Sequence, residues 1–417
     1  MHVGLRYRPV PELVALDLPG GPAFVDTLRA VWDTGDAAAP LDPRLPRAAR
    51  EALLAALRPS RVVASDGEHH VMAGGLPVEA GDALVVATSG SSGQPKGVVL
   101  THQALRASAR ATSDRLEIDP ARHAWLACLP LAHVGGLSVV TRALLTGTPL
   151  TVLPGFDADT VAALGRTERA THVSLVPAAL RRLDPALFTG ILLGGSRPPG
   201  DLPANVVVTY GMTETGSGVV YNGIPLDDVE VAIAHFDVRD GDRSWDDDGR
   251  DWDDDGRDWD DGEKGRDEGG EILLRAPMLL RCYRDGSTGR VLGPDGSKSW
   301  FATGDAGSLN PDGTLSVTGR IAEMITTGGE KVWPDEVERV LSTHRDVAEV
   351  AVWKRPDPEW GERVVAWVVA ADAQPKSEEL KELVAGTLSP WAAPKEIVFT
   401  TELPRTPSGK VKRSELR

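Results

Sequence analysis

The most constraining feature of the sequence is an apolar segment that runs directly into a loop of glycines, hydroxyl residues and one lysine. Residues 83–88 predict a buried strand, because a short valine-rich run bounded by turn residues is typical of a sheet interior. In the loop that follows, glycines let backbone N–H groups converge on an anion, and the hydroxyls and the lysine add donors and charge. We therefore predict a polyphosphate-binding loop, with these candidate ligands: Thr88, Ser89, Gly90, Ser91, Ser92, Gly93 and Lys96.

The spacing of this loop differs from that of a Walker loop. A Walker loop has four residues between its first glycine and a Gly-Lys pair that Ser or Thr follows. Here Lys96 precedes Gly97, and the earlier glycines do not have that spacing. A flexible surface turn is the alternative interpretation, but the strand before the loop and the Pro-Lys-Gly after it argue against this alternative.

Length and composition bound the class of protein. The 417 residues suffice for two or three domains, and 41% hydrophobic with 25% charged residues is typical of globular proteins. The net charge of −16 argues against a nucleic-acid partner, since phosphate backbones require a basic surface. No apolar run reaches the roughly 18 residues that a spanning helix needs, so we expect a cytoplasmic protein without membrane insertion. Cys128 and Cys282 are too few for a disulfide framework or a zinc site.

Much of the negative charge lies in residues 237–268. This segment holds 16 acidic and 6 basic residues, which is −10 of the total charge, and repeats an Arg-x-Trp-Asp-Asp pattern from Arg243, Arg250 and Arg257. The glycine in each repeat disfavours a helix, and the closing glutamate of an EF-hand loop is missing. We predict an expanded, mostly disordered surface insert, with calcium ligation and a docking arm as the alternatives.

Short apolar strands alternate with helical segments after the loop. Such strands are 150–153, 172–176, 190–193 and 205–209, and their alternation with helices predicts an α/β fold. Ligands of these folds gather at the carboxyl ends of the strands. The glycines and polar residues at those ends are Gly194, Gly195, Ser196, Tyr210 and Gly211.

Two more polar positions follow predicted strands. His133 stands between a buried strand and the pair Gly135-Gly136, where a hydrogen-bonded structural histidine is the more frequent interpretation. Glu214, beside Thr213, suits a magnesium ion that bridges nucleotide phosphates, or is an acid favoured at the start of a helix. The residues alone leave both alternatives open.

Residues 88–97 resemble the signature loop of the adenylate-forming superfamily, which includes acyl- and aryl-CoA synthetases, luciferases and peptide-synthetase adenylation domains. Further motifs fit this resemblance in the same order along the chain: 130–136, 210–214, 303–305 and 404–410. The chain also changes character near Ile321. We therefore expect a large N-terminal domain, residues 1–320, of mixed and parallel sheets with flanking helices, and a small mobile α+β domain, residues 321–417.

The resemblance implies ATP-dependent activation of a carboxylic acid as an acyl-adenylate, followed by transfer to coenzyme A. The loop and Lys96 then hold the pyrophosphate, Glu214 holds Mg²⁺, and the residues from Gly194 to Ser196 lie beside the adenine and the acyl group. Tyr210 stacks near adenine, Thr213 contacts phosphate, and His133 lines the acid pocket. The ribose hydroxyls are bound by Asp305 with support from Arg320, Lys410 bridges the attacking carboxylate and the α-phosphate, and Gly328-Gly329-Glu330 faces the thiol in the second step.

Within the superfamily the resemblance is strongest to the 2-succinylbenzoate–CoA ligases of menaquinone synthesis, over about residues 83–417 apart from the insert. The small residues 216–218 leave room for an aromatic acid. The alternatives are another aryl- or fatty acyl-CoA ligase, and a nucleotide-binding scaffold or an adenylation module that serves a carrier protein. Ala322 replaces the Asp or Lys that members often carry at the domain pivot, so the hinge position is left open. The oligomeric state is also open, with a homodimer as one alternative.

Overall fold

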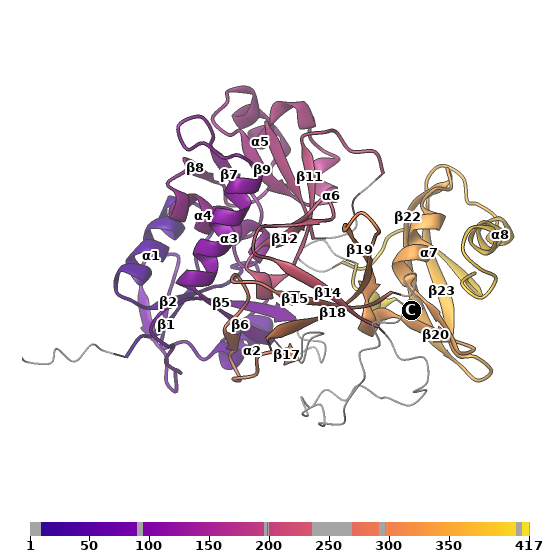
Figure 1. The fold of residues 1–417 in the computed structure, drawn as a ribbon, viewed down its shortest axis with the longest axis horizontal. Coiled ribbons are helices and arrows are strands. Elements are labelled where there is room, and N and C mark those ends of the chain that lie inside the picture. The colour runs from indigo at the N-terminus through magenta and orange to yellow at the C-terminus, as the bar shows by residue number, and fades with distance from the viewer. Residues whose placement is uncertain are drawn as a thin grey trace, which may run out of the picture. The chain divides into compact units, whose positions relative to one another are not determined.

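The computed structural model describes residues 10–89, 95–195, 198, 200–235, 269–291, 297, 299–405 and 411–416 (Figure 1). Backbone contacts divide these residues into two compact units. The first unit comprises the described residues up to 231 together with 274–301, and the second comprises 232–235, 269–273 and those from 302 onward. The predicted domain boundary near residue 320 stays a prediction, and the insert 237–268 lies outside the described residues.

The first sheet of the first unit carries the strand that precedes the predicted phosphate loop. Its strand order is β16-β6-β5-β2-β1-β3-β4, in which β1, β2, β3 and β5 are parallel neighbours and the remaining pairs are antiparallel. The strands are β1 (Leu13–Leu16), β2 (Ala37–Pro40), β3 (Arg61–Val63), β4 (His69–Val71), β5 (Asp82–Ser89), β6 (Pro95–Thr101) and β16 (Cys282–Tyr283). Helices α1 (Pro22–Asp33) and α2 (Arg47–Leu57) contact this sheet.

The second sheet is parallel over most of its width. Its order is β13-β12-β11-β10-β9-β7-β8, and the strands from β11 to β8 run parallel, whereas β12 and β13 are antiparallel. The strands are β7 (Trp125–Ala127), β8 (Leu150–Val152), β9 (His172–Leu175), β10 (Gly190–Leu193), β11 (Val206–Gly211), β12 (Gly218–Tyr221) and β13 (Ile224–Pro225). The predicted alternation of strands and helices, and with it the α/β fold, is therefore confirmed.

Helices α3 (His102–Arg115) and α4 (Val134–Thr146) lie side by side next to both sheets (Figure 1). Helix α3 contacts β6 of the first sheet and β12 of the second, and α4 contacts β7, β8 and β9. The Thr101 side chain caps α3 by accepting the N–H of Ala104 at 3.1 Å. Asp157 caps α5 (Ala158–Arg166) by accepting the N–H of Thr160 at 2.9 Å. Helix α6 (Pro177–Leu180) and the 3₁₀ turns η1 (Pro185–Leu187) and η2 (Thr213–Thr215) complete this part.

The second unit contains an α+β arrangement near the carboxyl terminus. Its sheet has the order β21-β20-β23-β22, with β24 parallel to β23. Helix α7 begins at Pro334, with Asp335 and Glu336 in its first turn, and ends at Leu341. The elements are η3 (Ile321–Glu323), β20 (Ile325–Thr327), β21 (Glu330–Val332), α7 (Pro334–Leu341), β22 (Val347–Asp357), β23 (Gly361–Ala370), α8 (Ser377–Thr387), β24 (Glu396–Thr400) and η4 (Arg413–Glu415).

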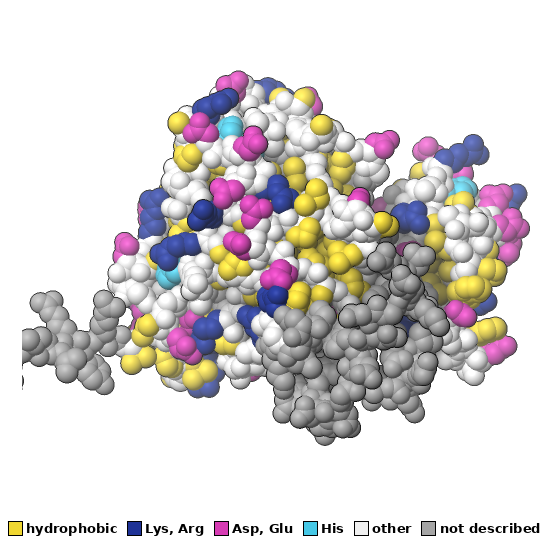
Figure 2. Space-filling model, viewed as in Figure 1, with side chains coloured by type: hydrophobic (Ala, Val, Ile, Leu, Met, Phe, Trp, Pro, Cys, Tyr) yellow, Lys and Arg dark blue, Asp and Glu magenta, His cyan; other side chains and the backbone are white. Residues whose placement is uncertain are grey.

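The remaining strands connect the two units along the chain. Strand β18 (Trp300–Leu309) begins in the first unit, where it pairs with β17 (Arg290–Val291), and continues in the second, where it pairs antiparallel with β19 (Leu315–Arg320). The chain also crosses from the first unit to the second within β14 (Glu230–His235), and it returns from the second unit to the first within β15 (Gly270–Arg275). Acidic, basic and apolar side chains are interspersed on the face seen in Figure 2. Among the described residues, no helix is long and apolar enough to cross a bilayer.

Candidate functional site

The predicted phosphate loop joins two antiparallel strands. Residues Thr88 and Lys96 face each other in the register of β5 and β6, one pair before the turn. A side chain at Gly97 would place its Cβ 2.7 Å from a methyl group of Leu57 and 2.9 Å from Val85, so close packing requires glycine there. The predicted ligands Gly90, Ser91, Ser92 and Gly93, and the side chain of Ser89, lie outside the described residues.

A tyrosine that sequence analysis missed lies between two predicted ligands. Tyr283 of β16 pairs with Val98 of β6, and its ring centroid lies 6.0 Å from the Lys96 Nζ. Its hydroxyl donates to Glu214 Oε1 at 2.9 Å. Strand β16 therefore brings the lysine of the phosphate loop and the predicted magnesium ligand to one place.

Glu214 fits a magnesium ion held largely by nucleotide and water oxygens. It lies half-buried in η2, and its backbone carbonyl accepts the N–H of Leu280 at 2.7 Å. Within the described part of the chain, no three His, Cys, Asp or Glu side chains gather into a closed metal cage. Magnesium in nucleotide sites is bound by one or two carboxylates plus phosphate oxygens and water, so a single carboxylate here matches that donor set.

The carboxyl ends of β10 and β11 meet at one edge of the second sheet because the strands are parallel neighbours. A Cβ at Gly194 would lie 2.7 Å from the Thr209 hydroxyl, and one at Gly211 would lie 2.3 Å from the Ser217 carbonyl. Gly195 has a φ of +85°, which favours glycine. The predicted Gly194, Gly195, Tyr210 and Gly211 are therefore brought together, while Ser196 lies outside the described residues.

The turn that carries Thr213 and Glu214 is held by a buried hydroxyl. Thr215 is fully buried, and its Oγ1 accepts the N–H of Met212 at 2.9 Å and donates to the Ser217 carbonyl at 2.6 Å. Gly216 ends the turn with a φ of +67°. Thr213 and Glu214 are only half-buried, so their side chains stay accessible while the backbone of the turn is anchored.

His133 stands at the N-terminal end of α4 and is exposed. The pKa of Asp42, just after β2, is lowered mainly by a hydrogen bond from Arg44 and in part by the charge of His133, so the histidine lies near that acid. The backbone packs closely at Gly136, because a Cβ there would lie 2.4 Å from the Leu129 carbonyl.

Arg142 is the least expected charged residue of the first unit. It lies in α4 and is 1% exposed, and its guanidinium stacks on Trp125 at 4.7 Å. The Nη2 donates to Ser217 Oγ at 2.9 Å, whereas the buried Nε and Nη1 have no hydrogen-bond partner among the described residues. Burial lowers the pKa of Arg142, which shows how unfavourable its surroundings are for a cation. The sequence signal was present, since Arg142 is the only charged residue of this helix.

The two predicted ribose-binding residues face each other across β18 and β19 in the second unit. Asp305 and Arg320 are register partners, and the Arg320 Nε lies 2.9 Å from Asp305 Oδ1. Arg320 also donates to the Thr303 carbonyl at 3.1 Å, and the Thr303 hydroxyl donates to the Ile272 carbonyl at 2.7 Å. The structure therefore brings this predicted pair together and anchors the turn that precedes it.

Glu271 supports the same turn and was not predicted. Its Oε1 accepts the N–H of Gly304 at 2.9 Å, where the φ of +69° favours glycine. Burial raises the pKa of Glu271, and the neighbouring charge of Asp305 raises it further. Lys410, the remaining predicted catalytic residue, lies outside the described residues.

Comparison with known families identifies the class of protein. Residues 76–284 match the model of the AMP-binding enzyme family, and residues 336–410 match the model of the AMP-binding enzyme C-terminal domain. The first match alone spans half of the chain. The chain therefore belongs to the AMP-binding enzyme family.

The similar proteins include CoA ligases and CoA synthetases with named acid substrates. The "Probable 2-succinylbenzoate--CoA ligase" of Mycobacterium tuberculosis is 35% identical over 85% of this chain and 90% of the relative. The indoleacetate–CoA ligase of Aromatoleum aromaticum is 36% identical over 80% of this chain and 66% of the relative. The o-succinylbenzoate CoA synthetase of Bacillus subtilis with its acyl-adenylate intermediate has a TM-score of 0.79 at 26% identity, covering 97% of this chain and 88% of that one. The same enzyme with ATP and a magnesium ion has a TM-score of 0.78 at 25% identity, covering 97% and 89%.

Proposed function

We propose that the chain is an ATP-dependent, AMP-forming acid–CoA ligase that activates 2-succinylbenzoate in menaquinone synthesis. Relatives of this activity match the chain over most of its length. The observation that carries the choice of acid is Arg142, a buried guanidinium without an acidic partner among the described residues. 2-Succinylbenzoate has two carboxylates, so one remains charged while the other is activated.

The proposed reaction has two steps. In the first, a carboxylate oxygen of the acid attacks the α-phosphorus of ATP, and the bond to the bridging oxygen breaks to release pyrophosphate. In the second, the thiol of coenzyme A attacks the acyl carbonyl, AMP leaves, and a thioester remains. Both steps require the protein chiefly to position the reactants and to neutralise charge.

Residues of the first unit serve the phosphates in this proposal. Lys96 and the loop after Thr88 bind the departing pyrophosphate, and Tyr283 orients the Glu214 carboxylate toward the magnesium position. Bound Mg²⁺ supplies neutralisation of phosphate charge. Tyr210 and the glycines at the ends of β10 and β11 accommodate the adenine side of the nucleotide.

Residues of the second unit bind the ribose of ATP and neutralise charge in the transition state of adenylation. Asp305 accepts hydrogen bonds from the ribose hydroxyls, and the ion pair with Arg320 orients its carboxylate. Lys410 neutralises the charge that develops between the attacking carboxylate and the α-phosphate. Between the two steps the C-terminal domain turns, which withdraws Lys410 and presents the face that includes Gly328 to Glu330 to the thiol.

The distal carboxylate of the acid is proposed to pair with Arg142. Leaving a buried charge without a partner costs several kcal/mol, about 3–5 in measured cases. An acid whose second carboxylate pairs with Arg142 should therefore bind much more tightly than an acid without one. Ser217, which contacts Arg142, belongs to the small segment 216–218 that leaves room for an aromatic ring. A monocarboxylate such as indoleacetate has no second anion for this guanidinium, although the similarity to an indoleacetate–CoA ligase keeps that acid as the second candidate.

A pyrophosphate-release screen tests the proposed function. Purified protein with Mg²⁺, ATP and coenzyme A is supplied with 2-succinylbenzoate, benzoate, indoleacetate and a fatty acid, and the thioester is identified by mass spectrometry. We expect the highest kcat/KM with 2-succinylbenzoate. A preference for indoleacetate would show that 2-succinylbenzoate is not the substrate, and transfer only to a carrier protein would show that coenzyme A is not the acceptor. If no acid supports turnover, the chain is a nucleotide-binding scaffold and not a ligase.

Tyr283→Phe is expected to weaken Mg²⁺ binding about tenfold in the presence of ATP, because the partner that orients a metal-binding carboxylate is lost. Isothermal titration of Mg²⁺ into the ATP-saturated protein measures this change. Tyr221→Phe is the matched control, since it also removes one tyrosine hydroxyl bond, to Thr112 at 3.0 Å, but not one to Glu214. Equal Mg²⁺ affinities of the two variants would contradict the role of Tyr283.

A further inference from the structure

An arginine near the carboxyl terminus contacts three carboxylates of the second unit. Arg413 Nη1 lies 2.5 Å from Glu323, and its Nη2 lies 2.7 Å from Asp335 and 2.9 Å from Glu338. The arginine side chain is only 19% exposed. Ion pairs that are this close and partly buried hold their backbone segments more firmly than exposed surface pairs do.

The three carboxylates come from two different elements. Glu323 ends the turn η3, three residues after Arg320, whereas Asp335 and Glu338 lie on one face of helix α7. Burial raises the pKa of Glu338 to about 7 and also raises the pKa of Glu323, and the charge of Arg413 opposes both shifts. The guanidinium therefore keeps together acids that would otherwise repel one another.

The same carboxylates connect Arg413 to the proposed ribose pair. The pKa of Glu323 responds to burial, then to Arg413 and Asp335, and then to Arg320 and Asp305. Of these groups, Arg413 is the one that contacts Glu323 directly, through an ion pair. The ion pairs of Arg413 themselves tie the end of the chain to η3 and to helix α7.

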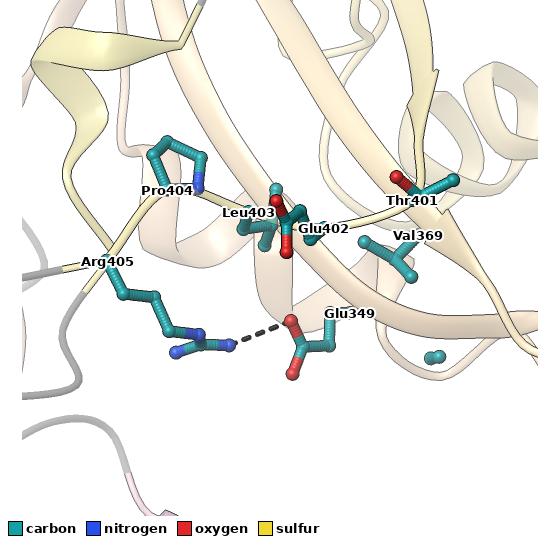
Figure 3. A pocket seen from close by; sticks show the side chains of 8 residues that line it. Glu349, Val369, Thr401, Glu402, Leu403, Pro404 and Arg405 are labelled. Carbon is teal, nitrogen blue, oxygen red and sulfur yellow. Dashed lines mark hydrogen bonds and ion pairs between the residues drawn. The ribbon is translucent and has the colours of Figure 1, made fainter.

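The chain is also held on the other side of residues 406–410. Arg405 pairs with Glu349 at 2.7 Å, and both residues line a pocket together with residues 401–404 (Figure 3). Arg405 and Val411 form an antiparallel bridge, and the N–H of Lys412 donates to the Pro404 carbonyl at 2.8 Å. The chain therefore leaves the described structure at Arg405 and returns beside it at Val411, with Lys410 one residue before the return.

We propose that Arg413 is a positioning residue for adenylation, which acts by fixing the stem from which Lys410 extends. This inference rests on the proposed function, because it assigns Arg413 a part in the step that uses Lys410. Arg413 contacts no reacting atom in this proposal. It sets where the backbone of the lysine begins, and misplacement of a catalytic group by about 1 Å can cost roughly 100-fold in rate.

The test compares the two half-reactions in Arg413→Gln, Arg413→Lys and the wild type. Adenylation is followed as pyrophosphate release without coenzyme A, and thioester formation is followed from supplied succinylbenzoyl-adenylate. We expect Arg413→Gln to lower the adenylation kcat roughly 10- to 100-fold with little change in KM for ATP, and thioester formation to change less than about twofold. Arg413→Lys should restore part of the loss, because it keeps the charge but not the forked geometry.

Arg355→Gln is the matched control, because Arg355 also forms a partly buried ion pair in the second unit, with Glu396. We expect it to lower Tm to a similar degree while the ratio of the two half-reactions stays that of the wild type. If Arg413→Gln does not fold, the two half-reactions are measured in Glu338→Gln instead, because this variant removes one of the three carboxylates and keeps the side-chain volume. A selective loss of adenylation supports the proposal, and an unchanged ratio of half-reactions overturns it. A wild type that forms no adenylate with any acid would instead refute the proposed function.

Discussion

Lys410→Ala is expected to lower adenylate formation by at least about 100-fold, the usual loss when one preorganised charge stabiliser of a transition state is removed. The attack of a carboxylate on a phosphate brings two anions together, and in our proposal the ammonium of Lys410 neutralises the charge between them. Thioester formation from supplied succinylbenzoyl-adenylate should change less than about twofold, because Lys410 is withdrawn during that step. Pyrophosphate release and thioester formation, measured separately, give the two rates.

Lys412→Ala is the control for this prediction. Lys412 belongs to the same terminal segment and pairs with Glu415, three residues later, with 47% of its side chain exposed. Exposed pairs of this kind contribute little, so both half-reactions should stay close to those of the wild type. Equal losses of both half-reactions in Lys410→Ala would show that the lysine has no specific part in adenylation.

Arg142→Met is expected to lower kcat/KM for 2-succinylbenzoate about 100-fold, chiefly through KM, without lowering Tm. Losing an ion pair to the distal carboxylate of the acid removes a charge-assisted contact in a dry site. The free protein, in contrast, loses a buried cation that has no acidic partner among the described residues, and replacement of such a charge by an apolar side chain is neutral or stabilising. Steady-state kinetics and thermal unfolding measure the two effects, and monocarboxylates such as indoleacetate should lose little.

Arg275→Met separates this effect from the loss of stacking. Arg275 also stacks on a tryptophan, Trp300, at 4.7 Å, but it pairs with Glu230. We expect a lower Tm and an unchanged order of preference among acids. A strong loss of stability in Arg142→Met, together with an unchanged preference, would mean that Arg142 serves the fold and that the choice of 2-succinylbenzoate loses its main support.

Sequence patterns predicted elements whose signals are local. The buried strand predicted at residues 83–88 lies within β5, and the strands predicted at 172–176 and 190–193 correspond to β9 and β10. The Asp305–Arg320 pair was also predicted, because both residues belong to motifs of the superfamily, and the β18–β19 register places them together.

Residues whose roles depend on distant partners were missed. Tyr283 lies 69 residues from Glu214 along the chain, and no local pattern marks the two-residue strand that brings it there. Glu271 and Gly304 are 33 residues apart, and Arg413 and Glu323 are 90 apart. A tertiary contact between side chains leaves no periodicity in the sequence, so these supports became visible only in the folded chain.

The sequence by itself indicated the class of chemistry, because its local motifs resemble those of the adenylate-forming superfamily, and the matches to AMP-binding enzyme families agree with that resemblance. It likewise determined the α/β architecture through the alternation of strands and helices. Only the tertiary structure decided that Arg142 has no acidic partner among the described residues and that three carboxylates share Arg413. The physical reason is that burial and pairing, which set the cost of a charge, are properties of the packed chain and not of the order of its residues.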